Sequence, residues 1–164
     1  MSRDPEVMRY LRPLATANAC GAWIDFQIAH QTAHGFCLWA TELRTSGRFI
    51  GATGLLHVGF TADFTPAVDL GWRTAREFWG RGYATEAARA ALKFGFDHEN
   101  KLPEIVARAG RENFRSHRIM IKLGMSHNGE DDFDHPRLKV GDPLRRQVLY
   151  RLTREEWLNQ NVEP

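Results

Sequence analysis

The run 66–96, PAVDLGWRTAREFWGRGYATEAARAALKFGF, constrains the fold more than any other part of this sequence. An extended stretch ends at Trp72, and a glycine loop, Gly80-Arg81-Gly82, precedes a helical pattern. That pattern consists of apolar residues at i, i+3, i+4 and i+7 spacing: Ala84, Ala87, Ala88, Ala91, Leu92 and Phe96. Because glycine lacks a Cβ, the loop can bring its N–H groups close to a ligand, and the first turn of a helix attracts anions. The run therefore predicts a strand and a helix that together cradle a pyrophosphate.

The composition is that of an ordinary globular protein, with 43% apolar and 26% charged residues in a chain of 164. One domain spanning residues 1–164 is expected at this length. The net charge of +2 favours neither nucleic acid nor a membrane as a partner. No apolar run reaches the length of a membrane span and no signal peptide is recognisable, so the cytoplasm is the expected location. Cys20 and Cys37 lack metal-ligand spacing and are expected to be buried thiols in a reducing compartment.

Two helices and a hairpin are expected before the glycine loop. The helices cover 4–11 and 17–34, and the second ends at Gly35 in the left-handed conformation. The apolar face of this second helix is predicted to contain Ala19, Ala22, Trp23, Phe26 and Ala33. Strands are expected over 36–43, with both faces buried, and over 49–60.

After the long helix, which is expected to end near Asn100, strand and helix patterns alternate. In order, they are a strand, a helix capped by Asn113, an irregular polar loop and a last strand: 104–110, 113–124, 126–146 and 147–152. Thr153 and Glu156 form a capping box for a C-terminal turn. This order indicates an α/β architecture, a mixed sheet with helices on its faces.

Three linked motifs carry a resemblance to a known family. DLGW, FWGRGYATEA and ENFRSHRIMIKLGM, in this order, resemble the GNAT superfamily of N-acetyltransferases, and most closely the branch that includes the ribosomal-protein N-terminal acetyltransferases. The likeness covers nearly the whole chain, from DPEVMRYL to VLYRLTREEW. It implies a mostly antiparallel sheet with helices on both faces, and acetyl-CoA as co-substrate with no metal.

The reaction that this resemblance implies is direct transfer of an acetyl group to a primary amine within a ternary complex. The amine would belong to a protein N-terminus or to a small molecule. A non-catalytic acyl-CoA-binding module of the same fold is the competing class.

The resemblance also assigns roles to particular residues. Asp69, where the branch usually has glutamate, would accept the proton of the amine, and Ser116 would donate a hydrogen bond to the departing thiolate. Asn113 would bind the amide chain of the coenzyme. Further coenzyme contacts would come from the strand beside the pantetheine arm and from the cradle: Leu70, Gly71, Trp72, Trp79, Gly80, Arg81, Gly82, Tyr83, Ala84 and Thr85. From the residues alone, Asp69 is also an ordinary strand carboxylate, Ser116 a helix-surface serine and Asn113 a plain N-cap.

The chain departs from the family pattern in three ways. Glu77 stands where the cradle usually begins with Arg or Gln, and Met120 stands where many members carry a tyrosine that acts as the acid. The strand that normally precedes DPEVMRYL is missing, which would expose an edge of the sheet at 36–43. Either the start is truncated, or another segment or a second subunit fills the gap. A homodimer that covers this edge is the expected assembly.

Other patterns admit both a functional and a structural interpretation. A basic cluster could meet the 3′-phosphate of the coenzyme, bind RNA or form a solvated face: Arg108, Arg111, Arg115 and Arg118. The acidic run 130–134 could attract a cationic amine or form a solvated loop. His30 and His34 have a metal-compatible spacing but no third ligand. A Rossmann dinucleotide site is excluded, because Thr85 replaces the third glycine and a hairpin precedes the loop.

Overall fold

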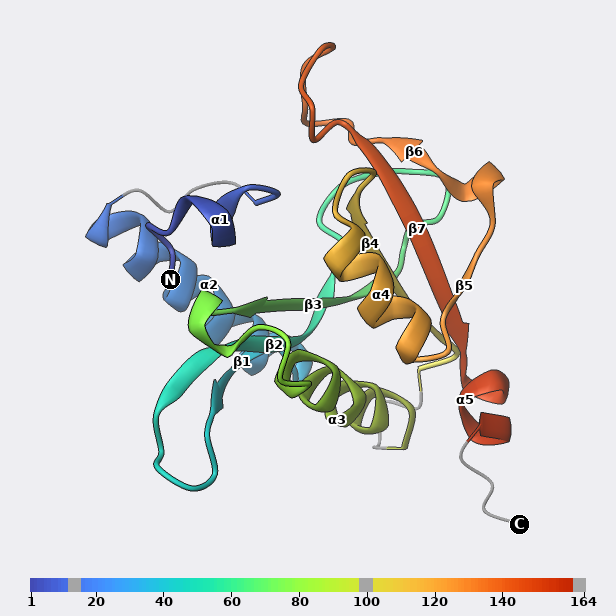
Figure 1. Ribbon diagram of the computed structural model, residues 1–164. Coiled ribbons are helices and arrows are strands. Elements are labelled where there is room, and N and C mark those ends of the chain that lie inside the picture. Colours follow the sequence, from blue (N-terminus) through green and yellow to red (C-terminus); the bar gives the residue numbers. More distant parts are fainter. Residues whose placement is uncertain (12–15, 98–101, 161–164) are drawn as a thin grey trace.

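The computed structural model describes residues 1–11, 16–97 and 102–160. Within them the strands are β1 (Leu38–Glu42), β2 (Phe49–His57), β3 (Val68–Thr74), β4 (Glu104–Gly110), β5 (Ser126–His127), β6 (Phe133–Asp134) and β7 (Arg146–Thr153). They form one sheet with the order β1-β2-β3-β4-β7-β5, and β6 also pairs with β7 (Figure 1). Every pair is antiparallel except β3 with β4, so the prediction of a mixed and mostly antiparallel sheet is confirmed.

The helices lie where the sequence predicts them. They are α1 (Pro5–Met8), α2 (Ala17–His34), α3 (Tyr83–Asp97), α4 (Phe114–Lys122) and α5 (Arg154–Gln160), with short 3-10 helices η1 (Arg76–Phe78) and η2 (Gly129–Asp131). Asp4 caps α1, and Gly35 ends α2 with a φ of 78°. Asn113 caps α4, and the capping box of Thr153 and Glu156 begins α5.

α3 packs on one face of the sheet through the apolar stripe that the sequence predicts. Ala88, Leu92 and Phe96 are fully buried. They share one hydrophobic cluster with side chains from the three central strands: Leu55, Leu70 and Ile105. Burying one such Leu or Phe contributes roughly 1.5–3 kcal/mol, so this face supplies much of the stability. The predicted end of this helix near Asn100 lies outside the described residues.

α2 lies on the opposite face of the sheet (Figure 1) and meets it through polar side chains. Its buried residues are Gln27 and His30. Gln27 Oε1 accepts a hydrogen bond from the N–H of Leu38 at 2.9 Å. The His30 ring contacts the Phe36 oxygen through Nδ1 at 2.6 Å and accepts from the His57 N–H through Nε2 at 3.2 Å. Hydrogen bonds to the backbone of the hairpin therefore fix which side of α2 faces the sheet.

The predicted apolar face of α2 is correct only in part. Ala19 and Trp23 are half-buried, but Ala22, Phe26 and Ala33 are exposed, and Phe26 is 52% exposed. Small alanines make the hydrophobic periodicity of this helix weak, and the polar residues that dock it break the pattern.

Two predictions about the sheet need correction. The sequence predicts β1 to be buried on both faces, but it is half-exposed, because it is the edge strand of the described sheet. The segment 126–146 is predicted to be an irregular loop, but it contributes β5 and β6, since both pair with β7.

The two cysteines are present as thiols, as predicted. Cys37 is buried and Cys20 is half-buried, and burial raises the pKa of the Cys37 thiol above its ordinary value. Among the described residues, no helix is long and apolar enough to cross a membrane.

Substitutions at two glycines test how closely β2 packs against Cys37: Gly54 lies in β2, and Gly21 in α2 serves for comparison. A Cβ on Gly54 would overlap the backbone oxygen of Cys37, whereas a Cβ on Gly21, inside α2, would meet nothing within 4 Å. We expect Gly54→Ala to destabilise the protein by about 1–3 kcal/mol, because backbone cannot move aside as a side chain can. Gly21→Ala should stabilise it by about 0.5–1 kcal/mol through helix propensity. Urea unfolding of both variants measures these differences, and equal stabilities would contradict the close packing of β2 against Cys37.

Candidate active site

The parallel strands β3 and β4 are paired at one position and then separate. The only residue pair in their register is Asp69 opposite Val106 among the described residues. Beyond it the two strands diverge, as Figure 1 shows. β3 remains paired with β2 along its whole length on the other side. Leu70, Gly71 and Trp72 therefore lie along a wedge between β3 and β4, with backbone groups on that side that β4 does not use.

The predicted cradle lies just after this wedge, between η1 and α3. Gly80 and Gly82 have φ angles of 74° and 86°, a conformation that favours glycine. A Cβ at either position would meet nothing within 4 Å, so the loop backbone is open to a ligand. The Trp79 N–H already donates to the Arg76 oxygen at 3.1 Å. The N–H groups from Gly80 to Thr85 donate no hydrogen bond to another backbone group in the described chain.

The start of α4 adjoins the cradle. The guanidinium carbon of Arg115 lies 4.3 Å from the centre of the Trp79 ring, and the Trp79 indole N–H donates to the Thr74 oxygen at 2.8 Å. Trp79 therefore links β3 to α4. Two helix N-termini, those of α3 and α4, thus lie near each other, and both favour a negatively charged ligand.

Two further predicted residues lie at this end of α4. The Asn113 side chain accepts a hydrogen bond from the Ser116 N–H at 3.3 Å, which confirms the N-cap. Ser116 is half-buried. Met120, at the position of the family tyrosine, is only 1% exposed and belongs to the hydrophobic core.

Asp69 lies on the other face of β3, in a partly buried ion pair. Its Oδ2 is 3.2 Å from Arg108 Nε, and the two side chains are 17% and 26% exposed. The atoms are close but not aligned as a hydrogen bond, so Arg108 Nε and Asp69 Oδ1 remain buried without a hydrogen-bond partner. Burial raises the pKa of Asp69 above that of an ordinary carboxyl group, although the positive charge of Arg108 opposes the shift. A carboxylate with a raised pKa holds a proton more readily than an ordinary aspartate does.

This ion pair separates Arg108 from the rest of the predicted basic cluster. Arg108 does not join the arginines of α4: its guanidinium carbon lies 5.1 Å from the centre of the Phe60 ring, on the Asp69 side of the sheet. Arg111 and Arg118 are exposed, and Arg115 contacts Trp79. The four arginines therefore lie in at least two separate parts of the structure.

Two carboxylates of the acidic run 130–134 form ion pairs with arginines, and a third contacts a histidine. Asp131 pairs with Arg151 at 2.8 Å, and Asp132 lies 2.8 Å from His127. Asp134 pairs with Arg145 at 3.1 Å. These contacts fasten the β5–β6 segment to β7 and its neighbours, so the structural interpretation of this run is favoured.

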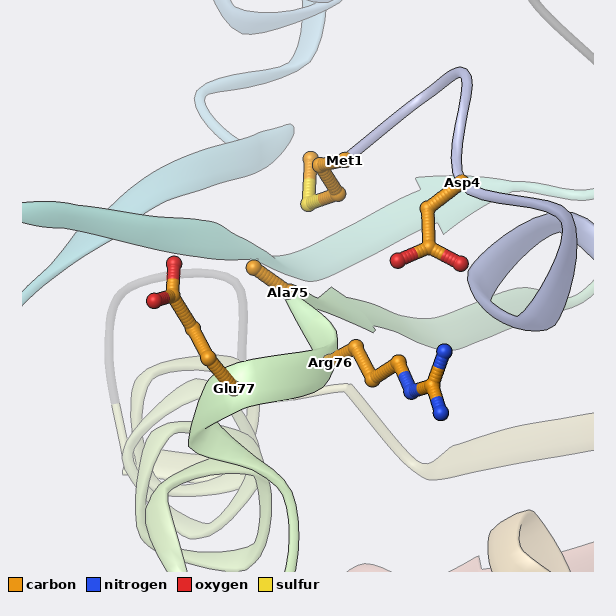
Figure 2. Close-up of a pocket in the computed structure, with 5 residues that line it drawn as sticks. All are labelled: Met1, Asp4, Ala75, Arg76 and Glu77. Atoms are coloured by element: carbon orange, nitrogen blue, oxygen red, sulfur yellow. The ribbon is translucent and has the colours of Figure 1, made fainter.

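Glu77, the departure at the start of the cradle, pairs with Arg48 of the β1–β2 turn at 2.8 Å. It lines a hollow of about 450 Å³ together with Met1, Asp4, Ala75 and Arg76. Figure 2 shows Glu77 on one side of this hollow and Asp4 on the other. None of the predicted site residues lines it, and the carboxylate of Glu77 is directed toward the hairpin.

The sequence did not single out Arg73, although the structure marks it as unusual. Its Nε and Nη1 are buried without a hydrogen-bond partner, and its guanidinium carbon lies 5.3 Å from the centre of the Trp23 ring of α2. The signal was present in the alternation along β3, where Asp69 and Arg73 occupy one face while Leu70 and Trp72 occupy the other.

Comparisons with known proteins agree on one family. Residues 1–126 match the family model described as an acetyltransferase (GNAT) domain. The uncharacterized protein YkkB from Bacillus subtilis (strain 168) is 32% identical over 125 residues, which are 76% of this chain and 71% of that protein. An FsC-acetyl coenzyme A-N(2)-transacetylase from Aspergillus fumigatus is 29% identical, and the match covers 96% of this chain and 68% of that protein. A GNAT-family acetyltransferase structure from Bacillus anthracis has a TM-score of 0.74 at 25% identity, covering 94% of this chain and 86% of the other.

The family match extends over most of the chain and includes the β3–β4 wedge, the glycine loop and α4. The chain is therefore an N-acetyltransferase that belongs to the GNAT family.

Proposed function

We propose that this enzyme moves the acetyl group of acetyl-CoA to a primary amine, on a protein N-terminus or a small molecule, by direct attack within a ternary complex. The observation that carries the proposal is the wedge after Asp69 and Val106, which opens toward a loop with two glycines at positive φ. The name of the Aspergillus fumigatus relative, an acetyl coenzyme A-N(2)-transacetylase, supports the same donor and a nitrogen acceptor.

The donor would bind mainly to backbone atoms. The free N–H groups from Gly80 to Thr85 would bind the pyrophosphate, and the exposed Arg81 would add positive charge. Leu70, Gly71 and Trp72 would pair with the pantetheine arm, and Asn113 would add a side-chain contact. Recognition by backbone would make Glu77, in place of a basic residue, compatible with coenzyme binding. When bound, acetyl-CoA supplies an activated thioester.

The protein's part in the chemistry is to hold donors and a base around that thioester. A backbone N–H in the wedge would polarise the carbonyl. Asp69 would take the proton of the attacking amine, directly or through water. Ser116 would donate a hydrogen bond to the departing sulfur, because the buried Met120 offers no donor.

Two finer aspects of the function are also proposals. One is membership of the branch with ribosomal-protein N-terminal acetyltransferases; a solved structure with such a title, from Brucella melitensis, has a TM-score of 0.67 at 14% identity, a likeness of fold alone. The other is a homodimer, which β1 would support because its outer side is an unpaired edge in the described sheet. The whole chain would act as one acetyltransferase domain.

Coenzyme binding should depend on the backbone at Gly82. Gly82→Val places a β-branched residue at a φ of 86° and should turn the loop N–H groups away from the phosphates. We expect acetyl-CoA affinity to fall on the order of a hundredfold, because several hydrogen bonds to a charged group are lost. Gly47→Val is the matched control, since Gly47 has a φ of 66° in the exposed β1–β2 turn. Calorimetry that finds the same affinity for both variants would disprove the cradle.

The role of Asp69 predicts a characteristic pH dependence. Asp69→Asn removes the base, which matters most where the acceptor amine is still protonated. We expect kcat/KM to fall about tenfold to a hundredfold near neutral pH, and the deficit to shrink as pH rises past the pKa of the amine. In the unmodified enzyme, activity should decline as pH falls through the raised pKa of Asp69. The exposed Asp25→Asn serves as control. A deficit that is constant with pH would assign Asp69 a structural role through Arg108.

Ser116 should affect turnover rather than binding. A hydrogen bond to developing charge strengthens as the thiolate leaves, so Ser116→Ala should lower kcat several-fold to about a hundredfold with little change in acetyl-CoA affinity. Steady-state kinetics and calorimetry measure the two effects separately. Turnover equal to that of the unmodified enzyme would leave water as the proton source.

A further inference from the structure

The buried side-chain atoms that lack hydrogen-bond partners lie on one face of the sheet and on the helix that covers this face. In the described part of the chain they belong to Gln27, Asp69, Arg73 and Arg108. Gln27 comes from α2, Asp69 and Arg73 from β3, and Arg108 from β4. Buried polar groups are nearly always paired in folded proteins, and the exceptions call for a water, an ion or a ligand. Their placement on this one face, with Gln27 and Arg73 at α2, indicates that a polar ligand binds on this face.

The side of β3 that carries these groups is opposite to the core. Leu70 belongs to the hydrophobic cluster with α3, and Trp72 packs against it. Successive side chains of a strand point to opposite faces, so Asp69, Gly71 and Arg73 face the α2 side. The contact of Arg73 with Trp23 of α2 agrees with this placement.

Arg73 is the most costly of these groups to leave unpaired. Its Nε and Nη1 are buried without a partner, and burial lowers the pKa of the guanidinium below its ordinary value. The Trp23 ring covers the guanidinium at 5.3 Å but offers no counter-charge. Arg73 is half-buried, and the nearby Cys20 opposes the lowering of its pKa. Taking two nitrogens of a charged group out of water without hydrogen-bond partners is nevertheless unfavourable. A ligand with a negative group would relieve that cost.

α2 carries a second buried hydrogen-bond donor, Gln27, in addition to Arg73 on β3. Gln27 follows Trp23 by four residues, so both lie on the same side of the helix. Its Oε1 is occupied by the Leu38 N–H, which leaves Nε2 as a buried donor. Leu38 itself lies over Gly71, with Cδ2 3.2 Å from where a Cβ would be. The side chains between α2 and β3 therefore form a row. It has hydrogen-bond donors at Arg73 and Gln27, and the apolar side chain of Leu38 over the middle of β3.

The free acceptor is at the other end of the row. Asp69 Oδ1 is buried without a partner and lies four residues from Arg73, about 13 Å along a strand. A molecule complementary to this row has an amine near Asp69 and oxygen acceptors toward Arg73. A carboxylate fits best, because the planar guanidinium fork binds it with two parallel hydrogen bonds.

We propose that the acetyl acceptor is an amine that also carries a carboxylate, and that Arg73, covered by Trp23 and assisted by Gln27, binds this carboxylate. The proposal rests on the proposed function, in which Asp69 receives the proton of the amine. Arg73 is then a specificity-determining residue. The carboxylate belongs either to a small amino acid or to an acidic side chain of a peptide.

The test compares acceptors that differ only in charge. The probes are ω-amino acids of increasing chain length, their carboxamides, spermidine as a cation without a carboxylate, and peptides with Asp or Asn next to a free N-terminus. In the unmodified enzyme, kcat/KM for the preferred carboxylate should exceed that of its carboxamide by roughly tenfold to a hundredfold. Preference for ω-amino acids identifies a small molecule, and preference for the Asp peptide identifies a peptide. Equal rates for carboxylate and carboxamide throughout would overturn the proposal.

Variants of Arg73 separate recognition from a structural role. Arg73→Met should remove the preference for the carboxylate and leave the carboxamide rate nearly unchanged, and Arg73→Lys should keep part of the preference. Without acceptor, the Tm of Arg73→Met should be unchanged or higher, because a half-buried charge with two unpaired nitrogens is replaced by an apolar side chain. Arg44→Met, in the exposed β1–β2 turn, is the control. A lower Tm with equal loss on both acceptors would make Arg73 a structural residue.

Failure of the proposed function gives a different result. If acetyl-CoA binds but no amine is acetylated, transfer to an amine is wrong. Calorimetry with the same ω-amino acids in the presence of acetyl-CoA then tests Arg73 directly. Binding that is present in the unmodified protein and lost in Arg73→Met would support the carboxylate site, and no binding would overturn it.

Discussion

The structure depends on one backbone pair, Asp69 with Val106, after which two parallel strands separate. Backbone groups beside such an opening must be satisfied by water or by a ligand, because no strand pairs with them. The opening also positions the segments that come after each strand. β3 leads through η1 to the glycine loop, and β4 leads to the N-terminus of α4. Two anion-attracting helix starts are thereby brought to one side of the sheet, and Trp79 with Arg115 joins them.

The two faces of the sheet differ in polarity and in how the helices pack on them. The α3 face is apolar and closely packed, with Leu55, Leu70 and Phe96 at 2% exposure or less. The α2 face is polar, and its helix docks through Gln27 and His30. Within the described residues, it also holds the buried side-chain atoms that have no hydrogen-bond partner. Stability therefore comes mainly from one face, and the other can keep unsatisfied groups for a ligand.

Much of this arrangement could be predicted from the sequence, because its signals are local. The stripe of α3, the glycines at positive φ, and the caps Asp4 and Asn113 each follow from residue types at fixed spacing. The docking side of α2 could not be predicted, since it depends on hydrogen bonds to a hairpin distant in sequence. Arg73 was missed for a similar reason. A strand arginine is usually solvated, and the packing of Trp23 against Arg73, which is half-buried, depends on the tertiary structure.

The backbone character of the glycine loop has an evolutionary consequence. In the proposed site, backbone N–H groups would bind the acetyl donor whatever side chains surround the loop, and Glu77 is paired with Arg48. Substitutions at Trp23, Gln27 or Arg73 would alter the chemistry offered to an acceptor without entering the apolar cluster under α3. With the acceptor site as proposed, a few changes on one helix and one strand would retarget the protein. Its descendants would then diverge in what they modify while retaining the same acetyl donor.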